Sequence, residues 1–155
     1  MIDESLFRQT LSHFASGVTV VTTAHEGRLA GLTVSSFASL SLRPPLVLIC
    51  IDHAATSHDV IAAAGQFAVN ILAEDQEYLS RRFAMHDSEK FAPHSYTLSP
   101  RGLPLLHGVL AQLECRLHSA LPGGDHTIFV GEVVDARVFG GRPLLYYRSG
   151  YHQLG

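Results

Sequence analysis

The chain has 155 residues, of which 46% are hydrophobic and 16% are charged, and its formal net charge is −3. This length predicts one domain over residues 1–155, and the negative charge with a single lysine, Lys90, excludes the basic surface typical of nucleic-acid binding. The low charged fraction predicts that part of the surface is covered by a subunit interface. No run approaches the roughly 20 apolar residues of a membrane span, and the first residues lack signal-peptide character, so we expect no membrane association and a cytoplasmic location.

Residues 3–16 are predicted to be helical, because apolar side chains recur there at helical spacing and Asp3 can cap the first turn. Two further helices are expected at 56–64, capped by Thr56 or Ser57, and at 75–84. Residues 85–101 are polar and are expected to be irregular. β-branched and apolar runs predict strands at 18–23, 29–34, 37–42, 46–51, 67–72, 109–120, 126–139 and 143–147. Strands joined mostly by turns favour an antiparallel barrel with helical decoration over a doubly wound parallel sheet.

Several familiar kinds of site have no motif in this chain. There is no G-x-S-x-G, no P-loop, no C-x-x-C and no G-x-G-x-x-G after a strand. His53 and His58 are five residues apart across a loop and a helix start, which is poor ligand geometry, so no metal site is expected. Cys50 and Cys115 lie in apolar runs and are expected to be buried free thiols.

Four features are candidates for ligand binding, and each has a plain structural alternative. Residues 31–41 are rich in hydroxyls at a strand end, which suits a phosphate or a polar ring edge but also a solvated edge strand. Thr56 and Ser57 open a helix and could bind an anion or simply cap it. Arg81, Arg82 and Lys90 could reach a phosphate, or could stabilise a helix end and face water. The turn at 122–126 could hold His126 at a strand mouth, or could be an ordinary hairpin.

Taken together in order, these segments resemble the flavin reductase family with the FMN-binding split barrel. More narrowly, they resemble the small reductase components of two-component flavin monooxygenases. The resemblance is carried by the runs SGVTVVT at 16–22, GLTVSSF at 31–37, PPLVLICI at 44–51, FAVNIL at 67–72, LSRRFA at 79–84, GDH at 124–126 and PLLYYRSGY at 143–151. It implies a mainly β fold, an antiparallel Greek-key split barrel with a few peripheral helices.

The resemblance also implies roles for individual residues around a flavin held near a homodimer interface. The flavin ring and ribityl chain would be lined by Leu32, Thr33, Val34, Ser35 and Ser36, with Ser39 or a neighbouring hydroxyl contributing. Cys50, Ile51 and Asp52 would border the isoalloxazine. Ser57 and Arg82 would approach the phosphate, with Phe83 and Lys90 nearby. Gly124 and Asp125 would present His126 to the nicotinamide, and Arg148 and Tyr151 would close that side.

The implied activity is NAD(P)H:flavin oxidoreduction that supplies reduced FMN or FAD to a monooxygenase. In it His126 would orient the nicotinamide and take no part in the redox step. Many relatives carry Ala-Asn where this chain has Val34-Ser35, which leaves the choice between FMN and FAD open. The alternatives are a flavin carrier or sensor without reductase activity, a reductase with a corrinoid or ferric acceptor, and a purely structural β-barrel interaction module.

Overall fold

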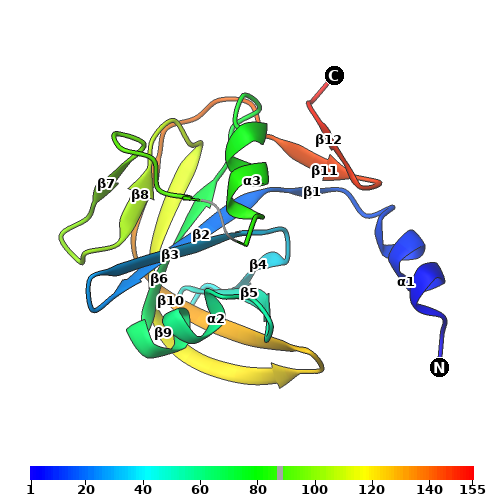
Figure 1. Ribbon diagram of the computed structural model, residues 1–155, viewed down its shortest axis with the longest axis horizontal. Helices are drawn as coiled ribbons and strands as arrows, with labels where there is room; N and C mark the ends of the chain where they lie inside the picture. The colour runs from blue at the N-terminus through cyan, green and yellow to red at the C-terminus, as the bar shows by residue number, and fades with distance from the viewer. Residues whose placement is uncertain (87–88) are drawn as a thin grey trace.

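The body of the protein, seen in a computed structural model that describes residues 1–86 and 89–155, is an antiparallel sheet of seven strands (Figure 1). Its spatial order is β3 (Arg28–Val34), β2 (Thr19–His25), β6 (Gln66–Ile71), β9 (Ala111–Gly123), β10 (His126–Val138), β5 (Leu46–Asp52) and β4 (Phe37–Ser41). β3 and β4 lie at opposite ends of this order, yet only Ser35 and Ser36 separate them in the chain. The two edges of the sheet must therefore approach each other, so the sheet curls in the manner of a barrel. The mainly β, antiparallel fold expected from the sequence is confirmed.

Two apolar cores hold this sheet together. The first fills its concave side with fully buried side chains, among them Val21, Ile49, Phe67 and Phe129. The second lies beside α3 (Glu77–Phe83) and includes Leu72, Leu79, Phe83, Leu106 and Leu144. The β-branched and aromatic residues that predicted the strands are thus the residues that fill the interior.

The first helix, α1 (Glu4–Leu11), stands away from the body of the molecule (Figure 1). Asp3 caps it as predicted, since its carboxylate accepts from the backbone N–H of Leu6. The helix does not reach residue 16, because Ser12 Oγ and His13 Nδ1 both bond the carbonyl of Gln9 and the chain turns there. β1 (Ser16–Gly17) follows and pairs with β11 (Leu145–Tyr147), which pairs in turn with β12 (Gly150–His152).

The second helix, α2 (His58–Ala64), packs chiefly against β2. A hairpin of β7 (Tyr96–Leu98) and β8 (Pro104–Leu106) was not expected, since residues 85–101 were predicted to be irregular. Residues 87–88 of that segment lie outside the described residues. Polar tertiary contacts hold the hairpin: Asn70 Oδ1 accepts from Leu106 N at 3.0 Å, and Thr22 Oγ1 donates to the Pro104 carbonyl. In the described parts of the chain, no helix has the length and apolar character needed to cross a membrane.

Candidate functional site

A groove between β3, the start of α2 and the end of α3 contains much of the predicted site. We call it the central groove; it has a volume of about 180 Å³. It is lined by Leu32, Thr33, Ala55, Thr56, Ser57, Phe83, Ala84, Met85, His86 and Lys90. A second hollow adjoins it, shares Thr56, Ser57, His86 and Lys90, and extends it toward Arg28. Hydroxyls, two basic side chains and an aromatic ring therefore meet in one place.

The carbonyl of Gly31 organises the polar end of the central groove. It accepts from Ser57 Oγ at 3.1 Å and from Lys90 Nζ at 2.8 Å. Burial lowers the pKa of Lys90. The Ser57 hydroxyl makes no cap bond to α2, so the predicted side-chain cap is wrong at this residue; the donor is used on Gly31 instead. A side chain at Gly31 would lie 2.9 Å from the Phe83 ring and 3.0 Å from the Val21 carbonyl, which explains the glycine.

α3 is fixed to the sheet by hydroxyl contacts. Thr33 Oγ1 donates to the Ser80 carbonyl at 2.5 Å, and Ser80 Oγ lies 2.6 Å from the Tyr151 hydroxyl. The guanidinium of Arg81 stacks over the Tyr151 ring at 4.9 Å, and the hydrogen bond that Arg81 donates to Glu77 raises the pKa of Arg81. These contacts join β3, α3 and β12, so the helix end that lines the central groove has a fixed position.

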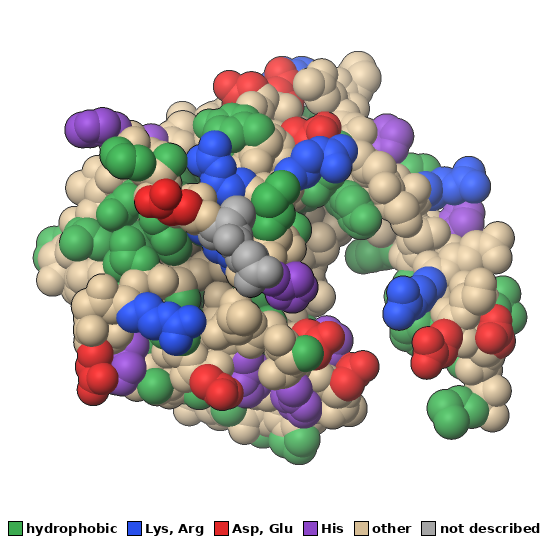
Figure 2. All heavy atoms as spheres, in the orientation of Figure 1, with side chains coloured by type: hydrophobic (Ala, Val, Ile, Leu, Met, Phe, Trp, Pro, Cys, Tyr) green, Lys and Arg blue, Asp and Glu red, His purple; other side chains and the backbone are tan. Residues whose placement is uncertain are grey.

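A larger groove of about 670 Å³ lies between α1 and the sheet, and we call it the arm groove. Figure 2 shows the hollow that separates this arm from the body of the molecule. From the sheet side it is lined by Ser35, Ser36, Phe37, Ala38, Leu48 and Cys50, and from the other side by Phe7, Arg8, Leu11, Phe14 and Tyr146, with Ser12, Ser16 and Ser149 completing the wall. The start of segment 32–36 lines the central groove and its end lines the arm groove. Likewise, β5 lines the arm groove and the loop after β5 lines the central groove, so neighbouring parts of the same two stretches of chain form the two grooves.

His126 lies at the first position of β10, opposite Asp52 of β5 and Gly123 of β9. Its Nδ1 is 2.6 Å from Asp125 Oδ1, which leaves Nε2 for a ligand. The hydrogen bond from His126, with the attraction of its charge, lowers the pKa of Asp125. The carbonyl of Asp125 also accepts from the His53 backbone N–H at 3.0 Å, which ties the turn to the loop after β5. The turn therefore presents an oriented imidazole beside the end of β5.

The site residues predicted from the sequence lie in different parts of the structure. The central groove holds Leu32, Thr33, Ser57, Phe83 and Lys90; the arm groove holds Ser35, Ser36 and Cys50; the strand ends beside them hold Asp52, Gly124, Asp125 and His126. The side chains of Val34 and Ile51 are buried in the first core, so only their backbones are available to a ligand. Arg82 stacks on Tyr78 at 5.6 Å, and Tyr151 contacts α3. Ser39 and Arg148 are exposed and line neither groove.

Sequence reasoning missed several lining residues. Ala55, Met85 and His86 carry no recognisable local signal, and Phe7, Leu11 and Phe14 were predicted only as part of the apolar face of a helix, with no role in a site. In the structure α1 buries none of its residues, so the apolar stripe of this helix does not pack into the core of its own chain.

The histidines near the site do not form a metal centre. His53 and His58 meet edge to face with ring centroids 5.4 Å apart, and His58 Nε2 lies 2.7 Å from Thr127 Oγ1. Across residues 1–86 and 89–155, no three His, Cys, Asp or Glu side chains converge as metal ligands. Cys50 and Cys115 are both free thiols; Cys115 is buried as expected, whereas Cys50 is only partly buried and lines the arm groove.

Comparison with known proteins gives consistent matches. Residues 11–155 match the model of the flavin reductase like domain. The chain is 44% identical over 150 residues to the reductase component of a 4-nitrophenol 4-monooxygenase/4-nitrocatechol 2-monooxygenase of Rhodococcus opacus, covering 97% of this chain and 80% of that protein. It is 41% identical to a flavin reductase of Pseudomonas putida, covering 97% and 89% of the two chains. Among solved structures, the NADH:FAD oxidoreductase SgcE6 of Streptomyces globisporus, in complex with NAD and FAD fragments, superposes with a TM-score of 0.94 at 38% identity and covers 99% and 93% of the two chains.

Proposed function

This chain belongs to the flavin reductase like domain family and is an NAD(P)H-dependent flavin reductase, and from that premise we propose which part of the flavin each of its grooves binds. The observation that carries the proposal is that one short segment, 32–36, lines the central groove with Leu32 and Thr33 and the arm groove with Ser35 and Ser36. One extended ligand with a phosphate end and a flat ring end fits that arrangement. Residues 1–155 act in this proposal as one reductase domain.

The phosphate end of the flavin belongs in the central groove. Ser57 and Lys90 supply donors there, and Thr56 adds a hydroxyl. Arg82, at the end of α3, gives a further positive charge beside the groove. Such a set of hydroxyl and cationic donors fits a phosphate and does not require a metal. Leu32 and Phe83 supply the apolar contact for the chain between phosphate and ring.

The ring end belongs beside the arm groove. Ser35 and Ser36 offer hydroxyls, and Cys50 lies on the neighbouring strand. When flavin and reduced nicotinamide are bound, they supply the hydride transfer themselves. The residues of this chain bind and align the two rings, since the reacting atoms must come within roughly 3–3.5 Å of each other. No acid or base of the chain is required.

His126 orients the nicotinamide in this proposal. Asp125 holds Nδ1 of the imidazole at 2.6 Å, so Nε2 faces a ligand in a fixed direction. A carboxamide or a ribose hydroxyl is the kind of group that this nitrogen can bond. Asp52 of β5, which borders the flavin ring in this proposal, lies directly opposite His126 in the strand pair.

We further propose a homodimer in which the second copy covers the arm groove. Phe7, Leu11 and Phe14 are 53%, 53% and 79% exposed, and α1 has no buried residue. An apolar helical stripe of this kind calls for a covering surface. Because the same groove holds the ring end of the flavin, the site becomes complete only when the second copy is in place.

We propose that the reduced flavin passes to a partner monooxygenase. Support comes from relatives named as reductase components of such enzymes, including the Rhodococcus opacus protein and the HsaB subunits. A cytoplasmic location belongs to the proposal, and the two free thiols agree with a reducing compartment.

An anaerobic assay tests this function and its site. The purified protein mixed with NADH or NADPH and with FMN or FAD should bleach the flavin absorbance. His126→Ala should raise the KM for the nicotinamide and lower its rate by tenfold or more, roughly the loss of one hydrogen bond to a ligand, while flavin affinity changes little. Absence of bleaching with every pair contradicts the reductase activity. A collapse of flavin affinity in His126→Ala contradicts only the role given to His126.

A further inference from the structure

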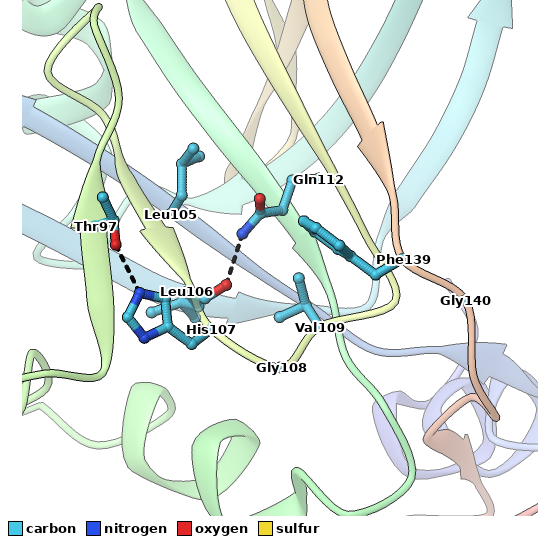
Figure 3. A pocket seen from close by; sticks show the side chains of 9 residues that line it. All are labelled: Thr97, Leu105, Leu106, His107, Gly108, Val109, Gln112, Phe139 and Gly140. Atoms are coloured by element: carbon cyan, nitrogen blue, oxygen red, sulfur yellow. Dashed lines mark hydrogen bonds between the residues drawn. The ribbon is translucent and has the colours of Figure 1, made fainter.

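A separate cavity lies beneath the β7–β8 hairpin, and we call it the hairpin pocket (Figure 3). Its volume is about 480 Å³, within the range of roughly 300–1,000 Å³ typical of small-molecule sites. It is formed by Thr97 of β7, the segment 105–109, Gln112 of β9 and the residues that follow β10. It shares no lining residue with the central groove or the arm groove, so the reductase site does not account for it.

The walls of the hairpin pocket are apolar and uncharged. Leu105, Leu106 and Val109 are buried and form one side. The ring of Phe139 stands at the opposite side, and it is 62% exposed. Neither Asp, Glu, Lys nor Arg is among the lining residues, so the pocket has no counterion for a phosphate or a carboxylate. A ligand of this pocket is therefore neutral, which separates it from flavins and nicotinamide dinucleotides.

One buried polar side chain reaches this apolar pocket. Gln112 is 3% exposed, and its Nε2 donates to the Leu106 carbonyl at 2.6 Å and to Asn70 Oδ1 at 3.2 Å. These two bonds fix which end of the amide is the nitrogen, and Figure 3 shows the oxygen turned away from the Leu106 bond. Within residues 1–86 and 89–155, no group donates to this oxygen. Among the described residues, the buried side-chain atoms without a partner are Glu114 Oε1 and Arg137 Nη1, so the Gln112 oxygen is not sealed inside the protein and a donor on a ligand in the pocket can bond it.

The polar groups at the rim are already engaged with each other. His107 Nε2 lies 2.7 Å from Thr97 Oγ1, and its Nδ1 lies 3.1 Å from the carbonyl of His94. Thr97 and His107 shape the entrance of the pocket. The amide oxygen of Gln112 remains as the acceptor to which a ligand can donate a hydrogen bond.

We propose that the hairpin pocket binds a small neutral aromatic molecule that carries one hydrogen-bond donor, of the phenol class. The donor bonds the Gln112 amide oxygen, and the ring packs against Phe139 and the leucine wall, as aromatic pairs do at ring-centroid separations of roughly 4.5–7 Å. This site is independent of the reductase activity proposed above, so either can fail without the other.

Fluorine NMR titration of the full chain tests the site with two probes, para-fluorophenol and para-fluoroanisole. They have similar rings, but only the phenol donates. We expect saturable binding of the phenol and binding of the anisole about tenfold weaker, the equivalent of one hydrogen bond. Saturating FMN should not displace the phenol. Absence of saturable binding, equal affinity for the two probes, or displacement by FMN overturns the proposal.

Matched variants locate the binding. Phe139→Ala should weaken the phenol about tenfold through loss of the ring contact. Val138→Ala should leave it unchanged, because Val138 is the neighbouring residue, 85% exposed and not part of the lining. Gln112→Leu keeps the apolar wall and should remove the preference for phenol over anisole. Since Gln112→Leu also breaks buried bonds, the pair at 138 and 139 decides the case if that variant does not fold; an equal loss in both members of the pair contradicts the site.

Discussion

The contact between Asp125 and His126 joins two neighbouring residues of an exposed turn, so its geometry is set by the local backbone. The pKa of Asp125 is lowered by the hydrogen bond from His126, so the folded chain binds this proton more weakly than the unfolded chain does. The contact is therefore present above the ordinary Asp pKa of about 3.9 and is lost as the pH falls through the lowered value. His126 should stay oriented by Asp125 throughout the neutral range.

NMR titration of the side-chain carboxyls measures this directly. Asp125 should titrate below about 3.9 in the native chain, and His126→Ala should return it toward that ordinary value. The carboxyl signal of Asp135 is the control, since Asp135 pairs with Arg137 at 2.8 Å and its signal should be the same in both proteins. An unchanged Asp125 pKa in the variant would show that His126 does not stabilise the carboxylate.

At the scale of elements, α3 depends on one buried amide. Gln76 Oε1 accepts from the Ala73 N–H at 3.0 Å, and Nε2 donates to the His107 carbonyl at 2.9 Å. Gln76→Leu keeps the size of the side chain but leaves both backbone groups without their partner. We expect it to lower the free energy of unfolding by about 1–3 kcal/mol and to weaken flavin binding, because α3 carries Phe83 and Arg82.

Urea unfolding and flavin titration check both effects. Glu77→Gln is the control, because it removes only an exposed pair with Arg81 at 2.8 Å, and exposed ion pairs contribute little to stability. If the two variants are equally stable, the Gln76 amide does not hold the start of α3.

At the scale of the whole molecule, the arm predicts the oligomeric state. Phe7→Asp with Leu11→Asp places two charges on the apolar stripe of α1 and should convert the proposed dimer to a monomer, with a loss of flavin affinity. Size-exclusion chromatography with light scattering and flavin titration measure the two changes. Ile2→Asp with Leu98→Asp is the matched control, since these residues are 55% and 54% exposed and line neither groove. A dimer that survives the change at 7 and 11 contradicts the role of the arm.

The same three scales explain how far the sequence could be interpreted. The β-branched run of β2 and the apolar run of β5 predicted their strands, because side-chain shape and burial act locally. The end of α1 and the pairing of Ser16 with Tyr146 could not be predicted, since they depend on side-chain bonds to Gln9 and on a strand far along the chain. The β7–β8 hairpin was missed for a similar reason, since the buried amide of Asn70 holds it from another strand.

For the candidate site, hydroxyl-bearing residues and glycines in the sequence indicated which segments form it. The direction in which each side chain points could not be predicted, because it depends on the fold. Val34 and Ser35 are adjacent in sequence, yet Val34 ends β3 in the core, whereas Ser35 lies in the connection after that strand and lines the arm groove. Residues such as Met85 and His86 enter the central groove only through the position of α3.

The carbonyl of Gly31 has a consequence for how tightly this enzyme can hold its flavin. Ser57 already gives its one hydroxyl hydrogen to that oxygen, whereas Lys90 uses only one of its three N–H donors there, so an incoming phosphate must compete for the Ser57 donor. For Ser57, binding is then an exchange of one acceptor for another, and its net gain is smaller than the new bond alone would give. A reductase built this way can let its product go within each catalytic cycle, because the oxygen of its own backbone takes the Ser57 donor back.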